Sequence, residues 1–235
     1  MAGLDKNIWV IANWKSNKNI AEALDWVAAV GPNLSKNENL KIVVCPTFST
    51  LSEVKKAITV GNFPILVGVQ DLSPFGVGAY TGEESAALLS QLVDLAILGH
   101  SERKKNFKED DEMVAKKAEQ AIDNKIIPLI CVQDEGTPVP KGCTMIAYEP
   151  IWAISTGLTN TPGAGRADMP EDANKIAGIF KQKYGQELEV IYGGSVDSSN
   201  IKGFITGDNI CGVLVGNASL DAEEFIKICK IMEQI

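Results

Sequence analysis

The chain has 235 residues, of which 45% are hydrophobic and 22% are charged, and its formal net charge is −8. This length is long for one ordinary domain and short for two. The acidic balance argues against a nucleic acid or an anionic membrane as a partner. No apolar run approaches the roughly 20 residues of a membrane span, and the segment Met1 to Asn7 lacks the apolar core of a secretion signal. We therefore expect a cytoplasmic protein.

The cysteines are odd in number and scattered along the chain. They are Cys45, Cys131, Cys143, Cys211 and Cys229. Their spacing does not indicate a disulfide framework, and no CxxC pair or Cys/His cluster suggests zinc. We expect reduced thiols, no metal and no cofactor.

Short apolar runs alternate with amphipathic runs along nearly the whole chain. The expected strands are Ile8–Ala12, Lys41–Cys45, Ile65–Val69, Leu95–Leu98, Ile127–Cys131, Met145–Ala147, Val190–Tyr192 and Val213–Val215. The expected helices are Ile20–Val30, Thr47–Thr59, Glu83–Leu92, Glu109–Asn124, Pro170–Tyr184, Ser199–Ile205 and Ala222–Ile235. The strands are continuously apolar, as in a parallel sheet that is covered on both faces.

This alternation predicts a closed (β/α)8 barrel that forms a single domain over residues 1–235. The alternative is an open doubly wound sheet, although no GxGxxG motif follows the first strand. One crossover is abnormal, because only about a dozen residues separate Val132 from Cys143, which is near the minimum for joining parallel strands. We expect the fifth helix to be replaced by a bare loop. The exposed apolar surface must then be covered by that loop, by flanking helices or by another subunit.

The run from Glu102 to Glu112 is densely charged. Its later acidic part, from Glu109 onwards, is typical of a helix start. Glu112 and Lys116 have the spacing of an i,i+4 ion pair. We interpret the run as a solvated helix end rather than as a site.

A single carboxylate, Glu149, ends the sixth expected strand, and Pro150 restricts the backbone around it. The segment that follows is apolar at first and then rich in small residues: Ile151, Trp152, Ala153, Ile154, Ser155, Thr156 and Gly157. Together with Pro150, it is a candidate lid that would close over an anionic ligand and exclude water from acid–base chemistry. The alternative is a structural glutamate followed by a hydrophobic loop packed on the body.

Polar residues follow several strands at their carboxyl ends, where barrel enzymes hold their reactive groups. The motifs are Asn13-Trp14-Lys15, Gly99-His100-Ser101-Glu102-Arg103, Glu149, Tyr192-Gly193-Gly194-Ser195 and Gly216-Asn217-Ala218-Ser219. With Gly78-Ala79-Tyr80-Thr81-Gly82-Glu83, these motifs resemble the triosephosphate isomerase family over nearly the whole chain. Each motif alone is a modest signal, whereas the ordered set is highly specific.

The resemblance implies the interconversion of dihydroxyacetone phosphate and D-glyceraldehyde 3-phosphate through an enediolate, in glycolysis and gluconeogenesis. It implies that Glu149 is the base, with His100 as a neutral donor and Lys15 as a fixed positive charge for the developing oxyanion. Asn13 would help to orient the substrate, and Glu102 would support the site from beside His100.

The resemblance also implies that backbone N–H groups bind the substrate phosphate, at Ser155 in the lid and at Ser195, Gly216 and Asn217 after strands seven and eight. The family usually has glycine at the positions of Ser155 and Asn217. Both residues keep an N–H group, and asparagine tolerates a left-handed backbone comparatively well. If Asn217 cannot adopt the glycine conformation, we expect weak substrate binding.

Two further departures are Leu158, where a polar hinge residue is common, and Asp71, where the family usually has asparagine; we expect neither to touch the chemical step. In the family, the Gly78–Glu83 loop reaches into a second subunit, with the Thr81 position near that subunit's Asn and Lys. We therefore expect a homodimer rather than a monomer with an exposed loop. The missing fifth helix adds the hypothesis of a higher oligomer.

Other interpretations stay open at this point. Outside its motif, His100 could be a structural histidine, Lys15 a surface lysine and Arg103 an ion-pair partner. A metal-dependent epimerase needs several histidine and carboxylate ligands, whereas His100 is the only histidine. A Schiff-base aldolase could use Lys15 as its nucleophile. A non-catalytic binding protein of the same descent would be expected to lose costly polar residues such as Asn13 and Glu149.

Overall fold

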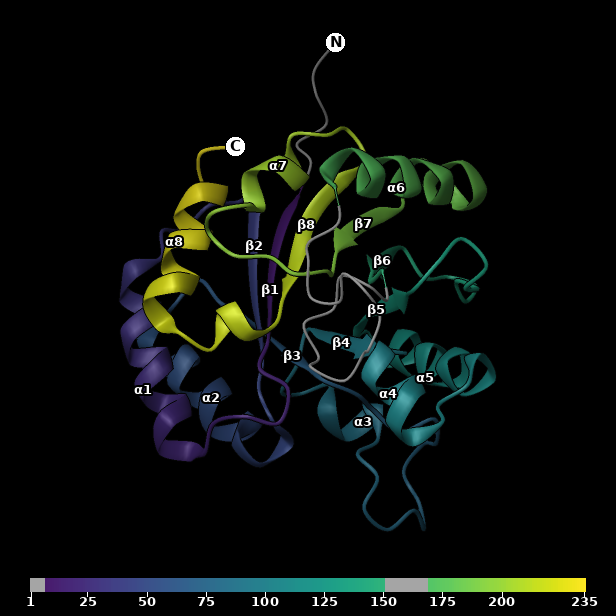
Figure 1. Ribbon diagram of the computed structural model, residues 1–235. Coiled ribbons are helices and arrows are strands. Elements are labelled where there is room, and N and C mark those ends of the chain that lie inside the picture. The colour runs from purple at the N-terminus through teal and green to yellow at the C-terminus, as the bar shows by residue number, and fades with distance from the viewer. Residues whose placement is uncertain (1–6, 151–168) are drawn as a thin grey trace.

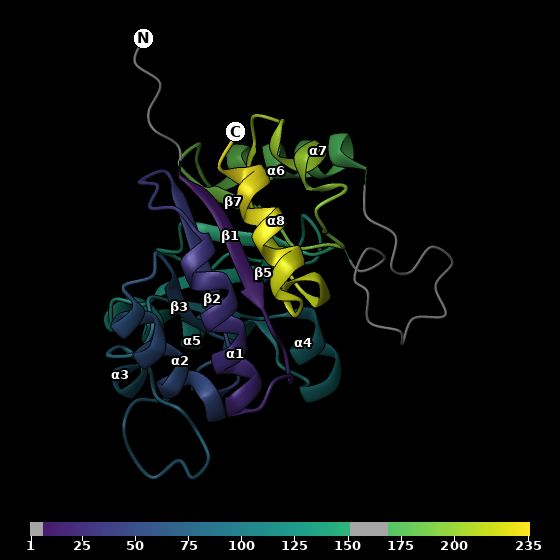
Figure 2. The same ribbon diagram turned by 90° about the vertical axis from the view of Figure 1, so that its left-hand side faces the viewer.

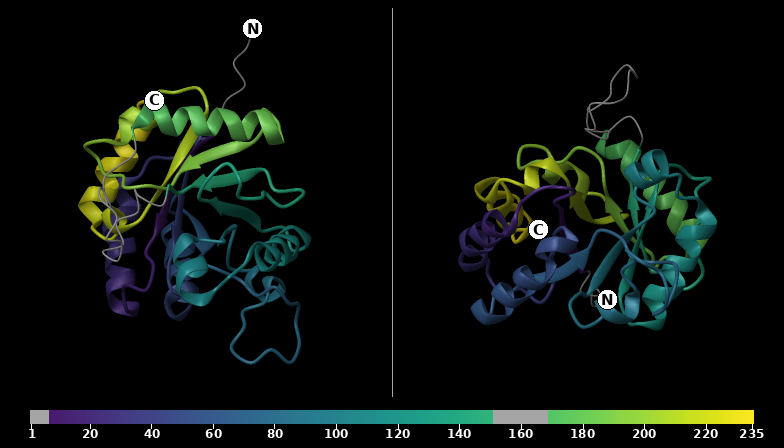
Figure 3. Two further views of the ribbon diagram at one scale, coloured as in Figure 1. Left: turned by 45° about the vertical axis from the view of Figure 1, so that its right-hand side comes forward. Right: turned by 90° about the horizontal axis from the view of Figure 1, so that it is seen from below.

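Parallel strands close into a barrel in the computed structural model, which describes residues 7–150 and 169–235. Each strand pairs with the next in chain order, and β8 pairs with β1. The strands are β1 Ile8–Asn13, β2 Leu40–Cys45, β3 Leu66–Val69, β4 Leu95–Leu98, β5 Ile127–Val132, β6 Met145–Tyr148, β7 Glu189–Tyr192 and β8 Ile210–Val215. Helices lie outside the strands (Figures 1 and 3). The closed barrel confirms the predicted fold class.

The helices mostly match the expected amphipathic runs. They are α1 Ile20–Val30, α2 Phe48–Gly61, α3 Ala86–Leu89, α4 Ser101–Phe107, α5 Asp111–Asp123, α6 Pro170–Tyr184, α7 Ile201–Ile205 and α8 Ala222–Met232, with 3-10 turns η1 Gly31–Asn33 and η3 Asn217–Ser219. Two differences stand out: α4 is not among the amphipathic runs, although the resemblance implies a helix that starts at His100, and α3 is much shorter than the predicted Glu83–Leu92. No residue of α4 is buried, so its sequence has no apolar stripe for a periodicity argument to detect.

Side chains of each strand alternate between two apolar layers. In β1, Trp9 and Ile11 lie in the barrel interior, whereas Val10 and Ala12 pack in the layer between strands and helices. Because both faces of the strands are covered, the strands read as unbroken apolar runs in the sequence. Helices α8, α1 and α2 lie next to one another over β1 and β2 (Figure 2).

The connection between β5 and β6, residues 133–144, contains no helix, as the sequence predicts. Thr137 of this loop is buried and Val139 packs against the core, while the Val139 N–H donates to Tyr184 Oη of α6 at 3.3 Å. Ile146 of β6 is fully buried. The loop and α6 therefore cover this side of the barrel without a second subunit.

The segment between β3 and α3, residues 70–85, begins and ends against the barrel, and its middle part projects away from it (Figures 1 and 2). It carries the Gly78–Glu83 loop, in which every residue is exposed. Across residues 7–150 and 169–235, no helix has the length and apolar character needed to cross a membrane.

Candidate active site

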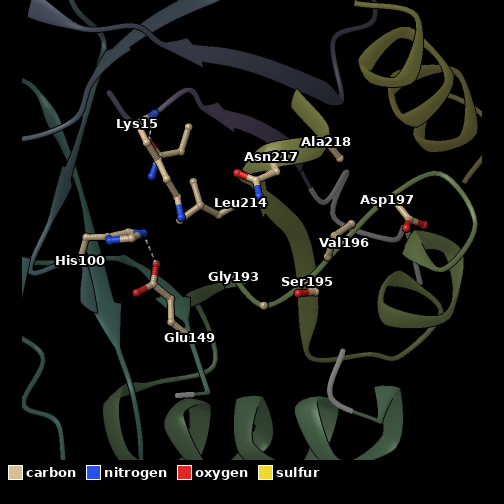
Figure 4. A pocket seen from close by; sticks show the side chains of 13 residues that line it. Lys15, His100, Glu149, Gly193, Ser195, Val196, Asp197, Leu214, Asn217 and Ala218 are labelled. Atoms are coloured by element: carbon tan, nitrogen blue, oxygen red, sulfur yellow. Dashed lines mark hydrogen bonds and ion pairs between the residues drawn. The ribbon is translucent and has the colours of Figure 1, made fainter. Parts of the chain in front are cut away.

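A cavity of about 220 Å³ lies at the carboxyl ends of the strands. The residues that line it are Asn13, Lys15, His100, Glu149, Gly193, Gly194, Ser195, Val196, Asp197, Leu214, Gly216, Asn217 and Ala218. Lys15, His100 and Glu149 lie on one side of the cavity, and Ser195 and Asn217 lie on the other (Figure 4). The fold thus brings residues from near both ends of the chain, from Asn13 to Ala218, together around one cavity.

Glu149 directly follows β6 and is 1% exposed. Its backbone N–H donates to Val132 O at 2.8 Å, which aligns it with the end of β5. Carboxylate Oε2 accepts from the Ser101 N–H at 3.1 Å, and Oε1 lies 3.2 Å from His100 Nε2. Both oxygens therefore face the start of α4, and the buried Pro150 follows immediately in the chain.

His100 is the N-cap of α4, where its Nδ1 accepts from the Glu102 N–H at 3.2 Å. The other ring nitrogen, Nε2, lies on the side of Glu149 at the cavity edge. His100 therefore stands at the start of a helix with one ring nitrogen held by the helix and the other facing the cavity.

Lys15 has a left-handed backbone, with φ at +53°, which costs a non-glycine residue roughly 1–2 kcal/mol. Two side chains hold it there: its N–H donates to Asn13 Oδ1 at 3.0 Å, and its C=O accepts from Gln70 Nε2 at 2.8 Å. Its Nζ forms an ion pair with Glu102 Oε1 at 2.7 Å. Glu102 does not line the cavity, but it contacts a residue that does.

Gln70 was not predicted from the sequence. It follows β3, so its place at the carboxyl end of a strand is the one signal that could have singled it out. Its two contacts are to backbone carbonyls, of Lys15 at 2.8 Å and of Cys45 at 3.0 Å, and such contacts leave no motif in the sequence.

The other side of the cavity is built mainly from a backbone turn. Asn217 begins η3, and the turn is closed by Ser219 Oγ, which donates to Gly216 O at 2.7 Å. Trp26 Nε1 anchors it from α1 by donating to Ser219 O at 2.9 Å. Asn217 is not among the described residues with positive φ. A glycine conformation is therefore not required of Asn217, and the N–H groups at this helical start have no intrahelical partner.

Gly193 has a steric role that the sequence did not reveal. Its N–H donates to Tyr148 O at 2.8 Å, and a Cβ added here would lie 2.8 Å from Glu149 Cγ. Contacts this short do not occur between real side chains, so any larger residue must displace Glu149.

Cys131 lies in the barrel interior beside Glu149. Burial raises the pKa of its thiol well above the ordinary value, and the neighbouring Glu149 raises it further. The thiol is therefore uncharged and leaves acid–base chemistry to the carboxylate.

Several predicted residues fall elsewhere. Ser155, the lid residues 151–157 and Leu158 lie outside the described residues. Arg103 forms ion pairs with Asp71 and Glu109, at 2.9 and 3.0 Å, as expected of a structural arginine. In the part of the chain that the structure describes, no group of three or more His, Cys, Asp and Glu side chains could hold a metal ion.

A buried carboxylate, an imidazole and a lysine side chain at the carboxyl ends of parallel strands define an acid–base enzyme of the (β/α)8-barrel class. The family model for triosephosphate isomerase matches residues 8–142 and 139–232. The chain therefore belongs to the triosephosphate isomerase family, whose members are isomerases.

Individual relatives agree with this assignment. The triosephosphate isomerase of Mesomycoplasma hyopneumoniae strain 7448 is 37% identical over 245 aligned positions, which cover 93% of this chain and 97% of the relative. That of Caldanaerobacter subterraneus subsp. tengcongensis is 37% identical over 243 positions, with the same coverage. The crystal structure of triosephosphate isomerase from Bartonella henselae has a TM-score of 0.79 at 27% identity and covers 97% of this chain and 99% of its own.

Proposed function

We propose that the protein interconverts dihydroxyacetone phosphate and D-glyceraldehyde 3-phosphate. The observation that carries this proposal is the convergence of Lys15, His100 and Glu149 on one cavity of about 220 Å³, in a chain of this family. These side chains provide a base, a neutral donor and a positive charge, which are the groups that proton transfer next to a carbonyl requires.

The reaction can be written with these groups in named roles. The Glu149 carboxylate takes a proton from the carbon next to the carbonyl, and the electron pair of that C–H bond forms the double bond of an enediolate. The negative charge collects on the substrate oxygens, where the His100 Nε2–H and the Lys15 ammonium stabilise it. The hydroxyl proton of the first carbon moves, through His100, to the oxygen of the former carbonyl, and Glu149 returns the carbon-bound proton to the neighbouring carbon. No electrons leave the substrate, so the chemistry balances without a redox partner.

Phosphate binding falls to the opposite side of the cavity. We assign it to the N–H groups of Ser195, Gly216 and Asn217, with Ser155 of the lid as a further donor. Because the whole chain is acidic, with a net charge of −8, an anionic substrate needs a local positive charge. Lys15 supplies one within the cavity lining, and Asn13 orients the substrate from the same strand end.

The ion pair of Lys15 favours isomerisation over a Schiff-base aldolase. Lys15 Nζ lies 2.7 Å from Glu102 Oε1, whereas a Schiff-base nucleophile must leave such a partner and attack a carbonyl carbon as a free amine. Borohydride trapping of a substrate adduct on Lys15 would reverse this preference.

We further propose that the protein is a cytoplasmic homodimer whose single domain spans residues 1–235. The projecting segment 70–85 supports the dimer, because Phe75, Val77 and Tyr80 are 45%, 69% and 44% exposed on it. Phe75 and Tyr80 stack with ring centroids 4.4 Å apart, so the segment presents an ordered apolar surface that a partner can bury. Thr81, at its exposed tip, is the proposed dimer contact.

A coupled assay with D-glyceraldehyde 3-phosphate tests the proposed activity. We expect turnover far above the uncatalysed background. Folded protein without turnover would contradict the proposal and would favour a binding role for this chain.

A further inference from the structure

Gln70 and Asp71 are neighbours in the chain, and they contact two different components of the active site. Gln70 Nε2 donates to the backbone carbonyl of Lys15 at 2.8 Å and to that of Cys45 at 3.0 Å. Asp71 forms an ion pair with Arg103, the residue that follows Glu102 in α4, at 2.9 Å. Lys15 and Glu102 are themselves paired across the top of the barrel.

The hydrogen bond from Gln70 fixes the backbone conformation of Lys15, and with it the direction in which the Lys15 side chain leaves the backbone. Lys15 holds an unfavourable positive φ, and such a conformation persists only where surrounding contacts determine it. Asn13 binds its N–H and Gln70 binds its C=O. Without the Gln70 amide, the carbonyl loses its partner and the backbone can relax, which moves the ammonium group away from Glu102.

The contacts of Asp71 fix the first turn of α4. Its two oxygens lie 2.7 and 2.8 Å from Lys117 Nζ of α5, and one of them also binds Arg103. Arg103 and Lys117 both contact Glu109 as well. Lys117 and Glu109 are 2% and 4% exposed, so the cluster of two cations and two anions has a buried ion pair at its centre, whereas the Arg103 side chain is partly exposed.

The charge balance of this cluster depends on Asp71. An asparagine here would leave the buried Lys117 and the partly exposed Arg103 facing one carboxylate, and it would offer a single acceptor oxygen. Removing one partner from a buried ion pair is strongly unfavourable, because the remaining charge stays desolvated. In this chain, the geometry of Arg103 and Lys117 is therefore adapted to an aspartate.

We propose that Gln70 and Asp71 are positioning residues for the Lys15–Glu102 ion pair. Gln70 sets the backbone of Lys15, and Asp71 sets the helix that carries Glu102. The dipeptide Gln70-Asp71 thereby fixes the positions of Lys15 and Glu102 relative to each other. The inference deepens the proposed function, since it concerns the same site.

The first test is a double-mutant cycle. Gln70→Met removes both N–H donors at similar side-chain length. We expect kcat/KM for D-glyceraldehyde 3-phosphate to fall about tenfold, the size expected for one or two lost hydrogen bonds. In a Glu102→Gln background, where the ion pair is already broken, the same change should lower kcat/KM by less than about twofold. An equal loss in both backgrounds would overturn the proposal.

The second test uses a matched pair of ion-pair variants. Asp71→Asn should lower kcat/KM about threefold, the size expected when a buried charged partner becomes a neutral acceptor. The control is Asp111→Asn, which breaks an ion pair between α5 and α4, from Asp111 Oδ1 to Lys104 Nζ at 2.7 Å, without touching Arg103. We expect no change in kcat/KM for the control. Equal losses would show that general loosening of α4, rather than Asp71, sets the rate.

A binding measurement separates this inference from the proposed activity. We choose 2-phosphoglycolate, whose carboxylate and phosphate resemble an enediolate phosphate, and titrate it by calorimetry. Gln70→Met should weaken its binding about threefold or more through the displaced Lys15 charge, with thermal unfolding showing that each variant is folded. Wild type that binds the ligand without turnover would contradict the proposed activity alone, and unchanged binding in Gln70→Met would overturn the positioning role.

Discussion

The two sides of the cavity are held in place by different means. Lys15, His100 and Glu149 form the proposed proton-transfer side, and side-chain contacts between distant segments fix them, such as the ion pair from Lys15 to Glu102. The proposed phosphate side, Gly216–Ser219, is a backbone turn closed by a contact within itself and anchored by Trp26. We infer that the first side depends on side-chain identity and the second on backbone conformation.

This difference predicts which substitutions each side tolerates. On the proposed phosphate side, where the resemblance implies a glycine at the position of Asn217, an N–H group in the right place is sufficient. Lys15, His100 and Glu149 are all retained on the proton-transfer side. The effects of substitutions on the two sides should therefore differ in size, and they should change different kinetic constants.

The largest expected effect comes from Glu149→Gln. A glutamine has nearly the same shape but cannot accept the substrate proton, so kcat should fall about a thousandfold or more. Affinity for 2-phosphoglycolate, measured by calorimetry, should change far less, because phosphate binding lies on the other side. An unchanged kcat would remove Glu149 from the role of base, and a comparable loss of affinity would break the separation of the two sides.

Gly193→Ala should give the next largest effect. The added methyl group would lie 2.8 Å from Glu149 Cγ, so the base must move, and misplacement of this kind costs about tenfold to a hundredfold in kcat. The control is Gly178→Ala in α6, where the nearest atom to the new methyl group is the side-chain nitrogen Nδ2 of Asn209, at 3.1 Å. Steady-state kinetics decides the matter: equal kcat values for wild type and Gly193→Ala would show that the base tolerates displacement.

Thr81→Asp tests whether a partner subunit supports the proton-transfer side. A charge buried in the proposed interface costs about 2–5 kcal/mol, so the variant should dissociate and lose about tenfold or more in kcat/KM. Sedimentation should give wild type a mass near twice the 25.2 kDa of one chain. A monomeric and fully active wild type would refute the dimer, and a population of dimers alone would exclude the higher oligomer.

Asn217→Gly should change little, because Asn217 does not occupy the left-handed region that favours glycine. We expect KM to change by less than about threefold, while the free energy of unfolding falls by about 0.5–1 kcal/mol from the greater freedom of the unfolded chain. A tenfold decrease in KM would show that asparagine perturbs the phosphate side after all.

The smallest effect concerns the pH dependence of stability at Asp71. Burial raises the pKa of this carboxyl above its ordinary value, although Lys117 and Arg103 lower it and Glu109 raises it. The folded state therefore binds the proton more tightly than the unfolded chain. The resulting contribution to stability is fully present below the ordinary pKa and is lost as pH rises through the raised value.

Unfolding experiments on wild type and Asp71→Asn at a series of acidic pH values measure this contribution. The free energy of unfolding of wild type, minus that of the variant, should decrease as pH rises through the raised pKa. A difference that increases with pH would show that the ion pairs of Asp71 outweigh its burial.

Much of the fold was predictable because both faces of each strand are apolar, which left strand runs such as Leu95–Leu98 plain in the sequence. The short α4 was missed since it buries none of its residues. Within the site, Lys15, His100 and Glu149 stand in motifs at strand ends. Gln70 was not predictable, because its role consists of two hydrogen bonds to carbonyls 55 and 25 positions away in the chain.

The most direct measurement is proton NMR of dihydroxyacetone phosphate incubated with the protein in D₂O. If Glu149 removes the carbon-bound proton and returns it through an enediolate, deuterium should enter the substrate carbon as isomerisation proceeds. Glu149→Gln should stop both processes together. Isomerisation by Glu149→Gln at the wild-type rate, or isomerisation by wild type with no deuterium in either triose phosphate, would contradict the account.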